Sequence, residues 1–220
     1  MRETLTERSL AYDYDPELGW MPQPGSASTI ETFRTTHYRH NSLGLRDEEF
    51  KLDAKPTIMF LGDSFVWGLD SEAEERFSDL LKPRNPDYKI LAAGVSGYGT
   101  DQEYLLLQKL WPKVKPAVVV LIFCGDNDRL DNVTSHRYDH YQKPYFATQP
   151  DGTLVLRGQP VPRSQANRIP FVKLEGADSI KEKKGWGPHW TPAGQKDVAD
   201  RIFAMLAENG VVAAAKKDER

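Results

Sequence analysis

A serine stands directly after an apolar run, where its hydroxyl could serve as a nucleophile. The stretch "IMFLGDSFVWG" (58–68) passes from apolar residues through Gly-Asp to Ser64. A serine at such a junction more commonly caps a helix or closes a turn. A nucleophilic Ser64 also needs a general base and donors for a developing oxyanion. The rest of the sequence must therefore supply both, and Asp63 would support the serine from the preceding position.

The candidate general base is His189. It lies in "GWGPHWTPAG" (185–194), where the flanking glycine and proline residues restrict the backbone. Histidine exchanges a proton readily near neutral pH, which suits it to this role. The other four histidines lie in irregular segments without such framing and are predicted to be surface residues; they are His37, His40, His136 and His140.

Two later loops offer donors for an oxyanion. Gly97, in "GVSGYGTDQ" (94–102), has no side chain to obstruct its backbone N–H. Asn127, in "CGDNDRLDN" (124–132), carries a side-chain amide. A turn glycine and an Asx turn are the ordinary interpretations of these two residues, and each would be preferred if the residue stood alone. Their order along the chain, behind Ser64, favours a shared site.

Three strongly apolar runs are predicted to position these loops. They are "TIMFLG" (57–62), "YKILAAG" (88–94) and "AVVVLIFCG" (117–125), and the third is the most apolar. Helical segments separate them, and this alternation predicts an α/β fold with a parallel sheet and right-handed crossovers. Ligands bind at the carboxyl ends of such strands, where all three loops fall.

The two separating helices are predicted from their patterns of apolar residues. "SEAEERFSDLLK" (71–82) begins with Ser71 and Glu74 in the spacing of a capping box. "TDQEYLLLQKLWPKVK" (100–115) begins in the same way, with Thr100 and Glu103. A final helix is predicted from Thr191 as N-cap and Pro192 at its first position to an end at Gly210. Its buried face would be Ala199, Ile202, Phe203 and Leu206.

The remaining segments are predicted to be less regular parts of a single domain that spans residues 1–220. Residues 1–50 form an irregular N-terminal extension, with a short hairpin in "TIETFRTTHYRH" (29–40). Residues 129–180 form an irregular insertion, with a hairpin that turns at Pro150-Asp151-Gly152. "IPFVKLE" (169–175) is a candidate fourth strand, although no helix is apparent before it.

Taken in order, "GDSF", the glycine of the second loop, "GDND" (125–128) and a late histidine before a helix resemble the SGNH/GDSL hydrolase family. The resemblance covers roughly residues 56–128 and again 185–207. It implies a flavodoxin-like three-layer α/β/α sandwich with a parallel central sheet and a serine esterase mechanism. It also implies that Ser64 is the nucleophile and His189 the base. The oxyanion donors would be the backbones of Ser64 and Gly97 and the side chain of Asn127.

The chain departs from this family at the third member of its triad. The family usually places an aspartate two or three residues before the histidine, where this chain has Gly187 and Trp186. Three explanations remain open. The backbone carbonyl of Trp186 could orient His189, an acid such as Asp178 or Glu182 could replace the aspartate, or the site could be crippled. The expected result is a slower enzyme, because a carbonyl supplies no full charge.

Aromatic residues beside the motifs are candidates for substrate contact: Trp67, Tyr98, Trp186 and Trp190. They could stack on a sugar ring or line an acyl pocket, and the alternative is that at least half belong to the core. We expect small acyl esters, including O-acetyl groups on carbohydrate, as substrates. Two alternatives stay open: an O-acyltransferase acting on a polysaccharide, and a carbohydrate-binding domain that has lost its catalytic acid. A nucleotide-binding domain is disfavoured, because "GVSGYG" does not fit G-x-G-x-x-G and no G-K-[ST] loop exists.

Bulk properties narrow the possible partners and compartment. The 220 residues carry a net charge of −3, which gives no electrostatic case for nucleic acid or an anionic membrane. One cysteine allows no internal disulfide, and one Cys with five scattered His gives no metal-site spacing. No cofactor or metal is therefore expected. No signal peptide or membrane-spanning run is present, so the cytoplasm is the default expectation; the native compartment and the oligomeric state stay open.

Overall fold

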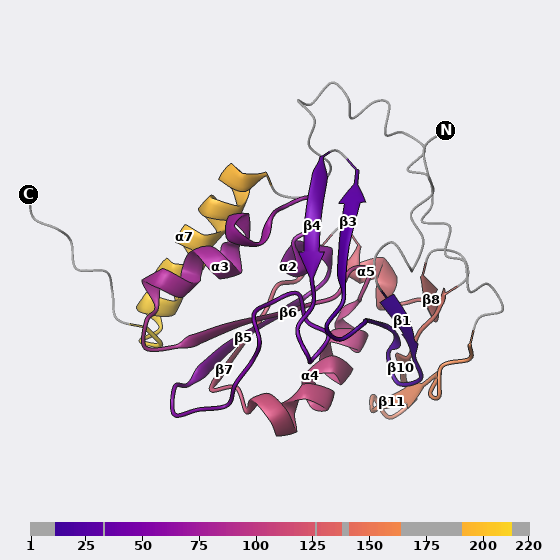
Figure 1. Cartoon of the computed structure of the whole chain (residues 1–220). Coiled ribbons are helices and arrows are strands. Elements are labelled where there is room, and N and C mark those ends of the chain that lie inside the picture. Colours follow the sequence, from indigo (N-terminus) through magenta and orange to yellow (C-terminus); the bar gives the residue numbers. More distant parts are fainter. Residues whose placement is uncertain (1–11, 33, 126, 138–140, 164–190, 213–220) are drawn as a thin grey trace, which may run out of the picture.

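The computed structural model describes residues 12–32, 34–125, 127–137, 141–163 and 191–212. Within these ranges the chain is a mixed α/β protein with a parallel three-stranded sheet (Figure 1). The central strand β5 (Thr57–Gly62) pairs with β6 (Lys89–Gly94) on one side and with β7 (Val118–Leu121) on the other. All three predicted strands are thus confirmed, and their parallel pairing brings their carboxyl ends to one edge.

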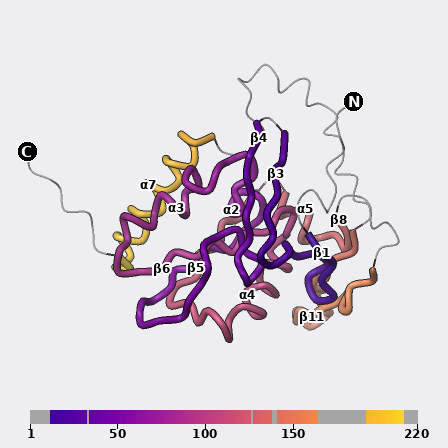
Figure 2. Tube along the Cα trace, viewed as in Figure 1, coloured from indigo at the N-terminus to yellow at the C-terminus, as the bar shows by residue number. Residues whose placement is uncertain are grey.

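The two faces of the sheet carry separate hydrophobic cores, because successive side chains of β5 point in opposite directions. Met59 and Leu61 pack with α4 (Thr100–Val114) in one core. Ile58 and Phe60 pack with α3 (Phe77–Leu81) and α7 (Pro192–Glu208) in the other. Figures 1 and 2 show α3 and α7 side by side, away from α4.

The strand β7 is only half covered, although it comes from the most apolar run of the sequence. Its residues alternate between partly buried and exposed positions. Val119 and Leu121 are 37% and 44% exposed, and Phe123 just beyond the strand is 48% exposed. These odd-numbered positions lie on the face of the sheet that carries α4. Within the described ranges that helix therefore leaves the edge of this face uncovered.

The predicted helix 71–82 is broken into two pieces, and its predicted capping box is wrong by one residue. A 3-10 turn, η1 (Ala73–Glu75), has Glu72 as its N-cap. The Glu72 N–H donates to the Glu75 carboxylate, so the capping box joins these two residues and not Ser71 and Glu74. Arg76 then adopts an extended backbone (φ −69°, ψ 144°) before α3 begins. The break lets the Arg76 side chain turn into the protein, where it is 1% exposed and pairs with Asp79 at 2.6 Å. A second 3-10 turn, η2 (Lys82–Arg84), follows α3.

The predicted helix 100–115 is confirmed as α4, but its cap also differs by one residue. Gly99 is the N-cap, and its N–H lies 3.5 Å from Oε1 of Gln102, so the predicted Thr100–Glu103 capping box is wrong. A side chain at position 99 would meet Cβ of Asp131 at 2.8 Å, which explains the glycine. The one-residue shift leaves Glu103 buried.

The N-terminal part is more regular than predicted. Residues 12–50 contain two antiparallel hairpins, β1 (Tyr12–Asp15) with β2 (Gly19–Pro22) and β3 (Ala27–Glu31) with β4 (Thr35–Arg39). The second confirms the predicted hairpin. Both hairpins contribute side chains to the core on the α4 face, so this segment is part of the domain.

The insertion contains the predicted hairpin. The strands β10 (Tyr145–Thr148) and β11 (Leu154–Arg157) pair across the Pro-Asp-Gly turn. A one-turn helix, α5 (Asp128–Asp131), and a small ladder of β8 (His136–Arg137) with β9 (Tyr141–Gln142) precede them. The candidate strand 169–175 lies outside the described residues.

The final helix α7 agrees with its prediction. The hydroxyl of Thr191 accepts a hydrogen bond from the Gly194 N–H at 3.1 Å, and Pro192 is the first helical residue. The predicted apolar face is buried, and Gly210 adopts a left-handed conformation two residues after the helix ends. No helix in the described ranges is long and apolar enough to span a membrane.

Candidate functional site

Three loops follow β5, β6 and β7 at one edge of the sheet, and the first and third are in direct contact. Ser64 is the first residue of the short helix α2 (Ser64–Trp67) and is partly exposed. Directly before it, Asp63 is 1% exposed and accepts a hydrogen bond at 2.9 Å from Nδ2 of Asn127. The structure thus brings Asn127 to the residue that precedes Ser64.

Asp63 also fixes the backbone that carries Ser64. Its Oδ1 accepts a hydrogen bond from the Phe65 N–H at 2.9 Å, which caps α2. Its Oδ2 is the atom that binds Asn127, so one buried carboxylate joins the two loops. The helix α2 packs directly on the end of β6, where a Cβ at Gly94 would lie 2.2 Å from the backbone nitrogen of Trp67. The supporting role predicted for Asp63 is consistent with these contacts.

Gly97 lies in the second loop, in a turn that requires a glycine. Its φ is +81°, and the Tyr98 N–H closes the turn on the Val95 carbonyl at 3.2 Å. A positive φ at this position is typical of a type II turn, which accounts for the residue type. Gly97 is buried, and its own N–H donates to no acceptor in the described part of the chain. With no side chain at this position, a substrate oxygen could approach the N–H closely, as the predicted oxyanion role requires.

The side-chain amide of Asn127 contacts three carboxylates. Nδ2 lies 2.9 Å from Asp63, 3.2 Å from Asp131 and 3.3 Å from Asp128. An amide nitrogen carries only two hydrogens, so these three acceptors compete for them. Substrate oxygen would have to displace one of these bonds to receive a hydrogen bond from Asn127.

The carboxylates around Asn127 belong to a buried acid cluster, which we define as Asp63, Asp101, Glu103, Asp128 and Asp131. Burial raises the pKa of Glu103 to about 9 and that of Asp128 to about 7, and the neighbouring acids add to both shifts. Among the described residues, two cations face the cluster: Lys143 pairs with Asp101, and Arg137 pairs with Asp131. No group of three or more His, Cys, Asp or Glu side chains in the described ranges is arranged to hold a metal ion. Burial together with the repulsion between these acids opposes ionisation of Glu103 and Asp128.

Glu103 gives this cluster a testable pH dependence. It is fully buried, and neither carboxyl oxygen has a hydrogen-bond partner among the described residues. Its pKa rises from an ordinary value of 4.5 to about 9, so between these pH values the folded state holds a proton that the unfolded state has lost. The stabilisation is complete below pH 4.5 and is lost as pH rises towards 9, by up to about 1.4 kcal/mol per pH unit.

We therefore expect Glu103→Gln to flatten the fall in stability between about pH 5 and about pH 8. Urea unfolding at several pH values measures the slope in the variant and the wild type. Glu74→Gln, at an exposed glutamate of η1, is the matched control and should retain the wild-type slope. Equal slopes in Glu103→Gln and wild type would show that Glu103 does not hold this proton.

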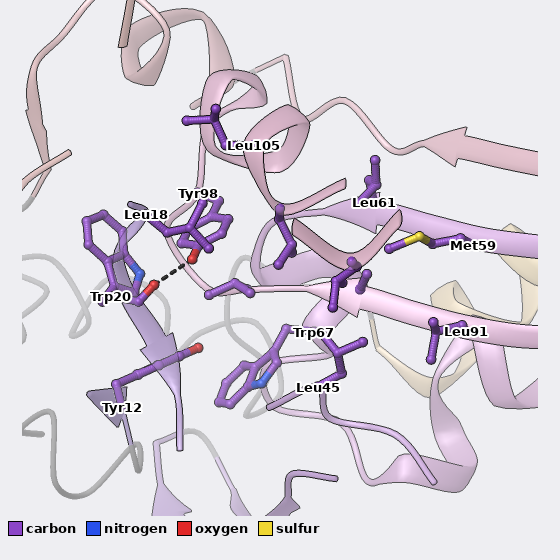
Figure 3. Close-up of a cluster of buried hydrophobic side chains, with 14 of the residues drawn as sticks. Tyr12, Leu18, Trp20, Leu45, Met59, Leu61, Trp67, Leu91, Tyr98 and Leu105 are labelled. Atoms are coloured by element: carbon purple, nitrogen blue, oxygen red, sulfur yellow. Dashed lines mark hydrogen bonds between the residues drawn. The ribbon is translucent and has the colours of Figure 1, made fainter. Parts of the chain in front are cut away.

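Two of the four predicted substrate-contacting aromatics belong to the core instead. Trp67 is 1% exposed and Tyr98 is 0% exposed (Figure 3). The Tyr98 hydroxyl donates to the Trp20 carbonyl, and the Trp20 indole N–H donates to the Ser96 carbonyl at 3.0 Å. This packing leaves neither ring a face for a substrate. Trp67 and Tyr98 are therefore core residues, which was the alternative interpretation of these aromatics. Trp186 and Trp190 lie outside the described residues.

His40, predicted to be a surface residue, is buried at 1% exposure. Its Nε2 accepts the Trp67 indole N–H at 3.1 Å, and its Nδ1 lies 3.0 Å from the Ser26 hydroxyl. Burial, together with Arg46 and Arg76, lowers its pKa to about 4, so the ring is neutral and can accept this bond. The surface prediction is correct for His37 and His136, whereas His140 lies outside the described residues.

The proposed base and the acids considered for it also lie outside the described residues: His189, Asp178 and Glu182. The sequence reasoning passed over Asp131 and Arg137, which the structure brings to the site. A usable signal for Asp131 was its spacing from Asp128, because residues three apart share one face of a helical turn. No sequence signal indicated Arg137, which arrives from the insertion.

No protein-family model matches this chain, and no curated protein matches its sequence.

Proposed function

We propose that this chain is a serine esterase of the SGNH/GDSL type, with Ser64 as nucleophile and His189 as general base. One observation carries the proposal: Asp63 and Asn127 are hydrogen-bonded at 2.9 Å beside Ser64, at the carboxyl end of the central strand. This contact sets a hydroxyl and an amide donor at one edge of a parallel sheet, where ligands bind in open α/β folds.

In the proposed reaction, the Ser64 oxygen attacks the ester carbonyl while His189 takes the hydroxyl proton. The resulting oxyanion receives hydrogen bonds from the Ser64 and Gly97 backbones and from the Asn127 amide. The C–O bond of the ester then breaks, and His189 gives its proton to the leaving alcohol. Water attacks the acyl-enzyme in the same manner, which releases the acid and restores Ser64.

The flavodoxin-like sandwich is part of the same proposal. The order β6–β5–β7 places the first strand of the sheet between the second and the third. The doubly wound flavodoxin-like order 2-1-3-4-5 begins in the same way. Helices on both faces of the sheet add support to this assignment.

The proposed substrates are small acyl esters, including O-acetyl groups on carbohydrate. With Trp67 and Tyr98 in the core, ring stacking on a sugar would depend on Trp186 and Trp190. Small model esters such as p-nitrophenyl acetate are therefore the appropriate first substrates, because they test the Ser-His chemistry without assuming a sugar site.

Covalent labelling tests the proposal directly. A fluorophosphonate probe reacts with an activated serine, and peptide mass spectrometry then locates the adduct. We expect the adduct on Ser64, together with measurable hydrolysis of p-nitrophenyl acetate. An unlabelled, folded protein that binds acetylated oligosaccharide would favour the carbohydrate-binding alternative. Labelling with turnover only after addition of a sugar acceptor would favour the acyltransferase alternative. A protein that is neither labelled nor active would contradict the proposal.

The oxyanion role of Asn127 predicts a specific kinetic change. Asn127→Ala should lower kcat on p-nitrophenyl acetate by about 10²–10³ with little change in KM, the usual loss for one oxyanion donor. Steady-state kinetics on folded protein measure both constants. The control Asn209→Ala, at the exposed C-cap of α7, should leave kcat unchanged. An increase in KM alone would argue that Asn127 binds the ground state and the transition state equally and is no oxyanion donor.

A further inference from the structure

A chain of hydrogen bonds runs from the insertion to Asp63, the residue directly before the proposed nucleophile. Arg137, on β8, donates from Nη1 to Oδ1 of Asp131 at 2.6 Å. The other oxygen of Asp131 accepts from the Asn127 amide at 3.2 Å, and the same amide donates to Asp63 at 2.9 Å. Asp63 caps the helix that begins with Ser64. Arg137 is thus joined to Ser64 through three intermediate residues.

The arginine matters because Asp131 lies in surroundings that oppose its charge. Its side chain is 3% exposed, and burial raises its pKa, while Arg137 and the hydrogen bond from Asn127 act in the opposite direction. Five charged or titratable groups in the described part of the chain face Asp131: Arg137, Lys143, Asp63, Glu103 of α4 and Asp128 of its own turn. Three of these are acids, so ionisation of Asp131 is favoured by the two cations together with the hydrogen bond from Asn127.

The protonation state of Asp131 decides which end of the Asn127 amide faces the cluster. An ionised carboxylate only accepts hydrogen bonds, so it favours the NH₂ end. A protonated carboxyl can donate to the amide oxygen and so favours the opposite orientation. An amide turned in this way would present its oxygen where the proposed reaction needs a donor.

We propose that Arg137 is a positioning residue for the reaction at Ser64: it keeps Asp131 ionised and thereby holds the NH₂ end of Asn127 towards Asp63 and the nucleophile. This inference rests on the proposed esterase function. It gives the insertion a part in the chemistry, because Arg137 and Asp131 both lie within residues 129–180, outside the strand-helix repeat that supplies Ser64, Gly97 and Asn127.

Steady-state kinetics across pH test this role. Arg137→Gln should lower kcat by about tenfold to hundredfold, the range of one hydrogen bond to a charged group, with KM unchanged. The acid side of its kcat profile should move to higher pH, because Asp131 without its cation takes up a proton more readily. Arg137→Lys keeps the charge and should restore most of kcat and the original profile. Arg201→Gln removes an exposed arginine that pairs with Asp197 on α7, and should match wild type.

A double variant separates this role from a general loss of structure. If Arg137 acts only through Asp131, then Arg137→Gln combined with Asp131→Asn should be no slower than Asp131→Asn alone. Additive losses, or a fall in kcat with no shift of the pH profile and no rescue by lysine, would overturn the proposal. Near-UV circular dichroism shows whether each variant is folded. If Arg137→Gln does not fold, Arg137→Lys takes its place, alone and in combination with Asp131→Asn.

Nuclear magnetic resonance tests the inference independently of turnover. The side-chain amide signals of Asn127, assigned through Asn127→Ala, should titrate at higher pH in Arg137→Gln than in wild type. If wild type is inert and unlabelled, the esterase proposal fails, but this titration still decides whether Arg137 controls the amide. Identical titrations in the two proteins would overturn the inference even if the esterase is active.

Discussion

Replacing Ser64 with alanine is expected to remove turnover of p-nitrophenyl acetate while leaving the protein folded. Ser64 is partly exposed at the first position of α2. The N-cap of this helix is the Asp63 side chain, which the substitution leaves in place. His189→Ala should have the same effect, because a nucleophile and its base act as one unit. Hydrolysis rates of the three proteins, with near-UV circular dichroism for their folds, measure the outcome.

The size of the Ser64→Ala loss also reports on the partner of His189. In one well-studied protease the serine is worth about 10⁶ in kcat and the aspartate alone about 10⁴. A loss near 10² would therefore mean that nothing replaces the missing aspartate, whereas a loss approaching 10⁶ would mean that another group supplies its charge. A Ser64→Ala variant as active as wild type would exclude Ser64 as the nucleophile.

Replacing Trp67 with alanine is expected to destabilise the fold by about 3–5 kcal/mol, the usual cost of deleting a large buried aromatic side chain. The Trp67 ring stacks on Tyr38 with 4.4 Å between ring centroids and an angle of 9°. Its indole N–H donates to His40 at 3.1 Å. The side chain also belongs to α2, so its loss should reduce activity through local disorder around Ser64. Urea unfolding measures the stability change.

The variant Trp67→Phe is the matched control for that experiment. Phenylalanine keeps an aromatic face for Tyr38 but loses the hydrogen bond to His40, so we expect a smaller cost of about 1–2 kcal/mol. A Trp67→Ala protein with wild-type stability and a raised KM would contradict the core assignment. That result would restore Trp67 as a substrate contact.

The sequence by itself determined the elements whose signals are local. The strands 57–62 and 88–94 follow from unbroken apolar runs, and α7 follows from Thr191, Pro192 and its apolar spacing. The hairpin at 145–157 follows from the Pro-Asp-Gly turn between two strand-like runs. Each of these patterns lies within one stretch of chain, where the physical preferences of neighbouring residues add up.

Only the tertiary structure decided the position of side chains that depend on distant segments. His40 and Trp67 are buried because the β3–β4 hairpin packs against α2, a contact that no local pattern in the predicted hairpin indicated. The predicted helix 71–82 breaks because Arg76 finds Asp79 and the Arg46 carbonyl inside the protein. In both cases a contact with a distant segment, the Trp67–His40 bond in one and the Arg76–Arg46 bond in the other, outweighs the local preference.

The candidate site divides in the same way. The sequence alone indicated Ser64, Gly97 and Asn127, because each stands in a loop that follows an apolar strand. The structure alone showed that Asn127 reaches Asp63, and that Asp131 and Arg137 extend this contact into the insertion. The physical reason is that a parallel sheet gathers the ends of its strands at one edge, whereas no local pattern encodes which side chains meet across the loops.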